Sequence, residues 1–72
     1  MRDYHINLFL NEADGLWVAD IPDLPGCSAH GETPEEAARE IQLAKTGWLE
    51  VARKIGKPIP EPTYRPAIYV AG

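Results

Sequence analysis

The sequence predicts a two-layer α+β fold with the element order βββαβ, in which one long helix lies on one face of an antiparallel sheet. Three observations support this fold class. Hydrophobic and polar residues alternate between residues 4 and 10, prolines and glycines interrupt the chain at 22–26, and a helix start is followed by apolar residues at spacings of three and four. A chain of 72 residues has room for one domain, which we take as residues 1–72.

Residues 3–22 are expected to form a β-hairpin. The alternating side chains are Tyr4, Ile6, Leu8 and Leu10 on one face of the first strand and His5, Asn7 and Phe9 on the other. This period of two is typical of a half-buried strand. Residues 11–15 then supply turn-forming Asn, Asp and Gly, and residues 16–21 are apolar and aromatic enough to return as the second strand.

Prolines end the hairpin. Pro22 and Pro25 each lack a backbone N–H, so the chain has to leave the sheet between them. Pro25 and Gly26 have the residue types expected at the two central positions of a type II turn. Residues 27–30 are predicted to form a short third strand beside the hairpin, and Gly31 ends that strand.

The helix is predicted at residues 34–55. Thr33 is the expected N-cap, Pro34 takes the first helical position, and Glu36 completes a capping box. Gly56 is placed for the left-handed position that ends a helix. The apolar stripe consists of Ala37, Ile41, Ala44, Trp48, Val51 and Ile55. At 1.5 Å per residue the helix is about 33 Å long, so we expect one end to extend past the sheet or to pack on a neighbouring subunit.

A proline-rich connector follows the helix. Pro58, Pro60, Pro62 and Pro66 favour an extended backbone over residues 57–66. Residues 67–70 read Ala-Ile-Tyr-Val, and their β-branched and aromatic side chains predict a final strand at an edge of the sheet.

Chain length and cysteine content favour self-association. A chain of 72 residues is marginal as a lone monomer, and its single cysteine, Cys27, allows neither an internal disulfide nor a cysteine-based zinc site. We therefore expect a homo-oligomer, a dimer or a tetramer, that buries Phe9 or a spare helix face formed by Ala38, Leu49 and Ala52. The lone thiol, together with the lack of a signal sequence or a membrane-length apolar run, favours a cytoplasmic protein without membrane contact.

The charge is divided unevenly along the chain. Residues 1–38 carry eight acidic residues and one basic residue, whereas residues 39–72 carry three acidic and six basic residues, for a net charge of −4. An acidic front half repels phosphate groups, so direct nucleic-acid binding through it is not expected. Two interpretations of this half stay open: it is a solvated surface, or it imitates the phosphates that a basic ribonuclease binds, in which case association would be salt-sensitive.

Three segments, in order, resemble a known family. They are residues 21–27 (IPDLPGC), 31–37 (GETPEEA) and 56–62 (GKPIPEP), and they make residues 4–62 similar to the HicB-like antitoxins. The resemblance implies a partial ribonuclease-H-like fold and binding to a small basic HicA-type toxin that cleaves messenger RNA. Many such antitoxins continue into a DNA-binding domain that these 72 residues do not contain, so we expect no operator binding by this chain alone.

The candidates for partner binding come from the hairpin and from residues 21–27, which we call the proline loop. They are Phe9, Trp17, Asp20, Asp23 and Leu24. The two aromatic residues are candidates because aromatic side chains dominate interface energetics, although Trp17 fits the core equally well. The two acids belong to the negatively charged half, and Leu24 follows Asp23 in the proline loop.

Catalysis is not expected. A two-metal nuclease would need acids that converge from several strands, whereas Glu36 is explained by the helix start and Asp23 by the turn. His5 and His30 have no further ligand at a recognised spacing, and Cys27 has no base at a triad spacing. We therefore expect neither a metal nor a cofactor. The functional hypothesis is an antitoxin-like module that occludes a toxin; the alternative is an orphan module that self-associates or binds a small ligand.

Overall fold

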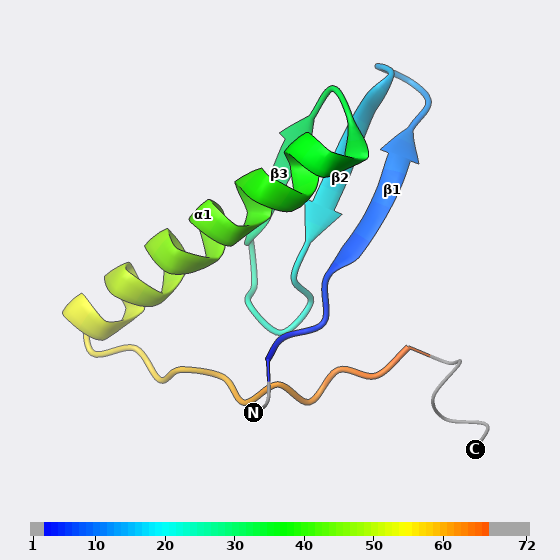
Figure 1. Cartoon of the computed structure of the whole chain (residues 1–72). Coiled ribbons are helices and arrows are strands. Elements are labelled where there is room, and N and C mark those ends of the chain that lie inside the picture. The colour runs from blue at the N-terminus through cyan, green and yellow to red at the C-terminus, as the bar shows by residue number, and fades with distance from the viewer. Residues whose placement is uncertain (1–2, 67–72) are drawn as a thin grey trace.

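The computed structural model describes residues 3–66, which form a three-stranded antiparallel sheet followed by one long helix (Figure 1). In chain order the elements are β1 (Asn7–Asn11), β2 (Leu16–Asp20), β3 (Ser28–Gly31) and α1 (Pro34–Lys54). The strands lie in the order β1-β2-β3, and α1 crosses one face of the sheet. The predicted α+β class is confirmed as βββα, and the final strand predicted at 67–70 lies outside the described residues.

The register of the strands decides which side chains meet the helix. Leu8 pairs with Ala19, and Ala19 with Ala29, so this row of side chains points to one face of the sheet. Ala19 is fully buried in the core cluster that includes α1, which identifies this face as the one that the helix covers. The next row, Phe9, Val18 and His30, points to the other face.

The helix covers this face of the sheet unevenly. It contacts β3 most and β1 least. Leu8 and Leu10 lie on the helix side of β1, as the alternation predicts, yet they remain 42% and 44% exposed. A helix is about 10 Å wide and strands are about 4.8 Å apart, so one helix cannot bury the far edge strand.

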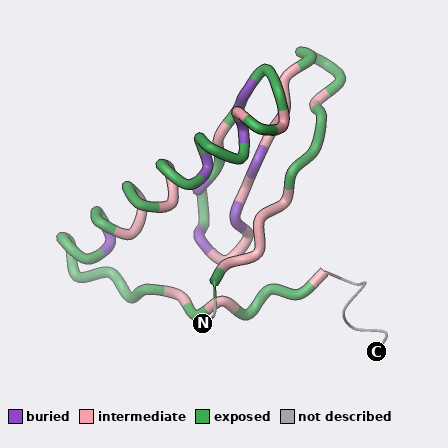
Figure 2. The backbone as a smooth tube through the Cα atoms, viewed as in Figure 1, coloured by how far each residue is buried: buried purple, intermediate pink, exposed green. Residues whose placement is uncertain are grey.

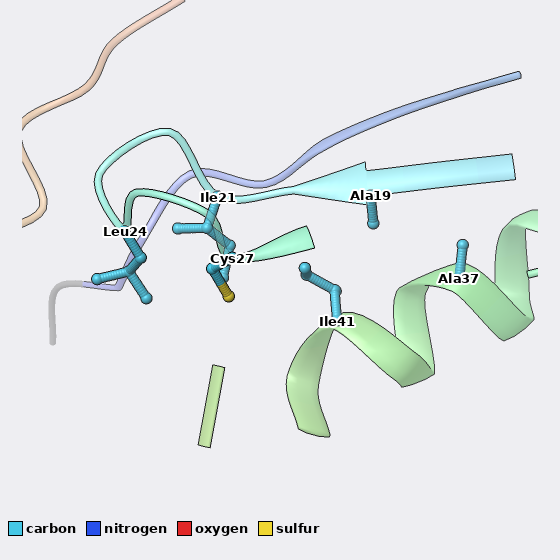
Figure 3. Packing of buried hydrophobic residues seen from close by; sticks show 6 residues of the cluster. All are labelled: Ala19, Ile21, Leu24, Cys27, Ala37 and Ile41. Atoms are coloured by element: carbon cyan, nitrogen blue, oxygen red, sulfur yellow. The ribbon is translucent and has the colours of Figure 1, made fainter. Parts of the chain in front are cut away.

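The loop between β2 and β3 continues their pairing. Ile21 N–H donates to the carbonyl of Cys27 at 3.1 Å, one step beyond the Asp20–Ser28 pair. Within the loop, Cys27 N–H donates to the Leu24 carbonyl at 2.9 Å and Gly26 has φ +80°, which are the bond and the dihedral of the predicted type II turn. The loop places Ile21, Leu24 and Cys27 in the core beside Ile41 of the helix (Figure 3).

Both ends of α1 are capped. Thr33 Oγ1 accepts the N–H of Glu36 at 3.1 Å, and Pro34 starts the helix, as predicted. The capping box is different from the predicted one: the Glu36 carboxylate accepts the N–H of Glu32 at 3.1 Å, one residue before the N-cap. At the other end, helical bonding stops at Lys54 with Ile55 as the C-cap, and Gly56 adopts φ +75° in a Schellman arrangement.

The predicted apolar stripe of α1 is wrong for its last two residues. Val51 and Ile55 are 58% and 69% exposed, whereas Ala52 is buried. Leu49, like Ala44 and Trp48, packs on the core, so the residues expected to form a spare helix face are largely part of the folded monomer. The reason is geometric, because the C-terminal half of α1 extends past the strands (Figure 1). There the helix contacts loop segments: Trp48 Nε1 donates to the Pro25 carbonyl at 2.9 Å, and Lys45 forms an ion pair with Asp3 at 3.3 Å.

The start of the helix lies very close to the sheet at Gly31. A Cβ built at this residue would lie 2.5 Å from the backbone nitrogen of Ala37 and 2.9 Å from the carbonyl carbon of Glu36. Both are backbone atoms in the first turn of α1, and neither can move without shifting the helix. Gly31 therefore sets the distance at which α1 packs on β3.

We expect Gly31→Ala to destabilise the protein by about 2–3 kcal/mol, because overpacking against backbone atoms is not relieved by a rotamer change. Urea unfolding followed by circular dichroism measures the loss. Gly26→Ala is the control: at φ +80° an alanine is strained, but its Cβ would meet nothing within 4 Å, so a loss of about 1 kcal/mol is expected. Equal losses in the two variants would contradict the packing role of Gly31.

Candidate functional site

No helix or strand of residues 3–66 covers the sheet face opposite α1 (Figure 1). We call it the open face. The register places these side chains on it: Asn7, Phe9, Asn11, Leu16, Val18, Asp20, Ser28 and His30. Phe9, on the edge strand, is 50% exposed, and it lies beside the half-buried Val18. The arrangement is an apolar centre surrounded by polar side chains.

Asp20 provides a negative charge on the open face. It lies across from Asn7 on one side and Ser28 on the other. Its side chain is partly buried, and its Oδ1 atom is buried without a hydrogen-bond partner among the described residues. A buried acceptor without a donor costs about 1–3 kcal/mol.

Asp23 is occupied within the chain. Its Oδ2 atom accepts the backbone N–H groups of Thr63 and Tyr64 at 3.1 and 3.0 Å, and its Oδ1 atom accepts the Thr63 hydroxyl at 3.1 Å. These bonds tie the segment after the helix to the proline loop, 40 residues apart in the sequence. The structure therefore gives Asp23 an internal role as a clamp.

The clamped segment, residues 57–66, is called the strap. It has no regular secondary structure and runs from the end of α1 back beneath the proline loop and the start of the chain (Figure 1). Tyr4 donates its hydroxyl to the Pro60 carbonyl at 2.6 Å, and the rings of His5 and Tyr64 lie 4.9 Å apart. Lys57 Nζ lies 5.0 Å from the centre of the Trp48 ring, a cation–π distance. The strap thus has contacts along most of its length.

Two other candidates lie on the helix side. Trp17 is half-buried and packs against the core cluster, which was one of the two roles open to it. Leu24 is fully buried, with 0% exposure, so its side chain belongs to the core and not to the surface that a partner meets. A lone leucine between two prolines is itself the missed signal, because a loop that closes on a small core needs an apolar anchor. The five candidates therefore do not form one cluster, and only Phe9 and Asp20 share the open face.

Sequence reasoning missed a groove between the C-terminal half of α1 and the proline loop. Its volume is about 440 Å³, and its lining includes Cys27, Trp48, Val51 and Ile55. Burial, which outweighs the opposing charge of Lys45, raises the pKa of the Cys27 thiol above its ordinary value. The thiol is therefore protonated at neutral pH, which agrees with a small buried residue and not with an activated nucleophile.

Two further findings concern the described residues. Among residues 3–66, no three His, Cys, Asp or Glu side chains are grouped so that they could hold a metal ion. In the same part of the chain, no helix has both the length and the apolar character needed to span a membrane. The site is thus defined by the surface chemistry of the open face and by the groove.

Comparison with known proteins identifies the family of the chain. The family model described as the HicB_like antitoxin of bacterial toxin-antitoxin systems matches residues 4–68, and the chain belongs to this family. A UPF0150 protein of Synechocystis sp. is 46% identical over 48 residues, which are 67% of this chain and 66% of the relative. A UPF0150 protein of Thermoplasma acidophilum is 34% identical over 53 residues, 74% of this chain and 77% of the relative.

The match thus spans just under two thirds of the length of the Synechocystis protein. No solved structure matches the chain.

Replacing Asp23 by Asn should loosen the strap. The amide has no charge, so the two N–H bonds from Thr63 and Tyr64 lose their charge assistance, and the Thr63 hydroxyl has to accept from the amide NH2 group where it now donates to the carboxylate. We expect a stability loss of about 1 kcal/mol, because bonds to an exposed carboxylate are weaker than buried ones. We also expect faster hydrogen exchange at the amides of Thr63 and Tyr64. Glu61→Gln, in the strap itself, is the control, and the proposed clamp is contradicted if both variants exchange alike.

The Tyr4 contact should fail in alkali. Burial first, and then carboxylates of which Glu61 acts most strongly, raise the pKa of Tyr4 above its ordinary value of 10.0. A group with a raised pKa in the folded state stabilises the fold below its unfolded pKa, and this contribution is lost as the pH rises through the folded value. Stability curves of the wild type and Tyr4→Phe, measured by urea unfolding from pH 8 upward, should therefore converge above about pH 10. Parallel curves over this range would contradict the Tyr4–Pro60 bond.

Proposed function

We propose that this protein neutralises an RNA-cleaving toxin of the HicA type by binding it through the open face of the sheet and occluding its active site, without catalysis of its own and in the cytoplasm. The observation that carries the proposal is that the half-exposed Phe9 and Asp20 share the open face, which no helix or strand of residues 3–66 covers. Family membership supports a toxin as the partner in general. The HicA type and the manner of inhibition are our inference.

Phe9 has the properties of an interface anchor. An aromatic side chain that is 50% exposed can bury a large apolar area without ordering many rotamers. Around it, Asn7, Asn11 and Ser28 offer amide and hydroxyl groups that can form the polar rim of an interface. We infer that the toxin covers Phe9 and places its own polar groups against this rim.

Charge supports a basic partner. Asp20 lies on the open face, and Glu12 and Asp14 are exposed in the turn between β1 and β2, at the opposite end of the same hairpin. A protein that binds RNA through lysine and arginine would be attracted to these carboxylates as it is to phosphates. Complementary charge raises the association rate and makes it depend on ionic strength, because screening shortens the range of attraction.

A second candidate function rests on the groove. Its volume of about 440 Å³ is within the usual range for small-molecule sites, and Trp48 and Ile55 give it an apolar wall. A ligand-binding module that has no toxin partner would use this groove and leave the open face unoccupied. The two functions therefore differ in the surface that a binding experiment detects.

The experiment is a titration of the purified protein with a purified toxin of the HicA type, read out by calorimetry and by protection of an RNA substrate from cleavage. We expect Phe9→Ala to weaken binding at least tenfold, because central aromatic anchors are worth about 2 kcal/mol or more. We expect Asp20→Asn to slow association and to reduce its dependence on salt.

Ile59→Ala is the matched control, since Ile59 is an apolar strap residue with 39% exposure. It should bind like the wild type. Equal binding by the Phe9 and Ile59 variants would place the toxin on another surface, and RNA cleavage that continues in a saturated complex would overturn the occlusion mechanism.

A further inference from the structure

α1 carries a second exposed apolar surface, which the sheet does not cover. Leu43 and Val51 are 66% and 58% exposed (Figure 2 shows the exposed positions along this helix). Gly47 lies midway between them and is also exposed. Leu43 and Val51 are thus apolar residues that face solvent, one helical turn on either side of Gly47. The packing of the monomer does not explain them.

Gly47 itself has no role in the fold of one chain. A Cβ built at this position would meet nothing within 4 Å, so no neighbouring atom requires a glycine there. A glycine inside a helix is less favourable than an alanine, because it adds conformational freedom to the unfolded chain. The feature that a glycine offers in return is close approach by another backbone. Gly47 thus indicates contact with a second helix.

The spacing around Gly47 is symmetrical. Glu40, Leu43, Gly47, Val51 and Lys54 are separated by three, four, four and three residues. At 100° per residue these five positions lie within an arc of about 80° on the helix surface. We call this row the seam. Its order is the same in kind from either end: charge, aliphatic residue, glycine, aliphatic residue, opposite charge.

We propose that two copies of this chain pair through the seam, with their α1 helices antiparallel and a two-fold axis at Gly47. In this arrangement Leu43 of each copy packs against Val51 of the other, and Glu40 of each copy meets Lys54 of the other. A two-fold interface requires a surface that is complementary to itself, and the order of the seam meets this requirement. The glycines let the helix axes approach at the crossing point.

The charges select the antiparallel direction. A parallel pair would place Glu40 against Glu40 and Lys54 against Lys54, whereas the antiparallel pair makes two ion pairs of opposite charge. Both side chains are exposed, and neither takes part in an ion pair within residues 3–66. Exposed ion pairs contribute little affinity, so Leu43 and Val51 supply the attraction and the charges fix the orientation.

The groove shows on which flank of α1 the seam lies. Gly47 and Val51 line the groove together with Ser28, the first residue of β3, so the seam lies on the side of α1 next to this edge strand. The open face is on the other side of the sheet. Self-association through the seam therefore does not depend on the proposed toxin binding, and either can fail without the other.

The pairing should be weak. Five residues per copy bury less than the roughly 800 Å² per partner of a stable protein complex. We expect a dimer with a dissociation constant on the order of 10 μM, which sedimentation equilibrium detects over a range of protein concentrations.

The test is a charge-reversal cycle. Glu40→Lys and Lys54→Glu each place like charges opposite one another and should weaken dimerisation at least tenfold. The double variant E40K/K54E restores opposite charges in both pairs and should dimerise like the wild type. Arg53→Glu reverses a charge in the same helical turn but away from the seam, so it should leave dimerisation unchanged.

Gly47→Ala gives a second readout with opposite signs. Because its Cβ meets nothing in the monomer, the variant should melt at a higher temperature under dilute conditions, yet it should dimerise more weakly. A wild type that stays monomeric at all concentrations overturns the proposal. So does a double variant no better than the single ones, or an Arg53→Glu variant as weak as Lys54→Glu.

Discussion

The proline loop is the constraint on which the rest of the structure depends. It extends the β2–β3 pairing by one step through the Ile21–Cys27 bond, and it turns back on itself through the Leu24–Cys27 bond. In doing so it buries three side chains that one helix and three short strands could not enclose alone (Figure 3). The loop also forms hydrogen bonds with two other parts of the chain. The Pro25 carbonyl accepts the indole N–H of Trp48 in the helix, and the Asp23 carboxylate accepts a backbone N–H of the strap. A segment without regular secondary structure therefore joins the sheet, the helix and the strap.

The small number of elements also explains why some surfaces stay exposed. The core of the described residues is small, with Ile21, Leu24 and Ile41 as its largest fully buried side chains. With one helix, such a chain can cover one face of its sheet, and the other face stays open. The helix of 21 residues is also longer than the strands of four or five residues. At 1.5 Å per residue the helix is about 30 Å long, whereas a strand of five residues is about 17 Å long. The open face and the overhanging end of α1 follow from these proportions.

The sequence revealed the parts of the fold that local chemistry decides. Thr33, Pro34 and Gly56 fix the ends of the helix through bonds to residues within one turn, and Gly26 fixes its turn in the same way, so their roles can be derived from neighbouring residues. Val51 and Ile55 could not be assigned correctly, because an apolar period does not tell where the sheet beneath a helix ends. Asp23 and Leu24 were named as candidates for partner binding, and their contacts within the chain were not foreseen for a related reason: their partners in the strap and core are distant in sequence, and only the folded chain brings them together.

The two surfaces proposed for binding differ in the physics that would govern them. On the open face, a single aromatic side chain lies among polar groups and near carboxylates, which suits a partner of opposite charge and makes recognition sensitive to salt. The seam has both signs of charge in a symmetrical order, so it attracts only a copy of itself in one orientation. The two surfaces lie on different sides of the sheet and come near each other at Ser28, which is on the open face and also lines the groove beside Gly47 and Val51. A dimer held by the seam has one open face in each copy, so it would bind two toxins independently of one another. Neither surface requires the core to change when a partner binds.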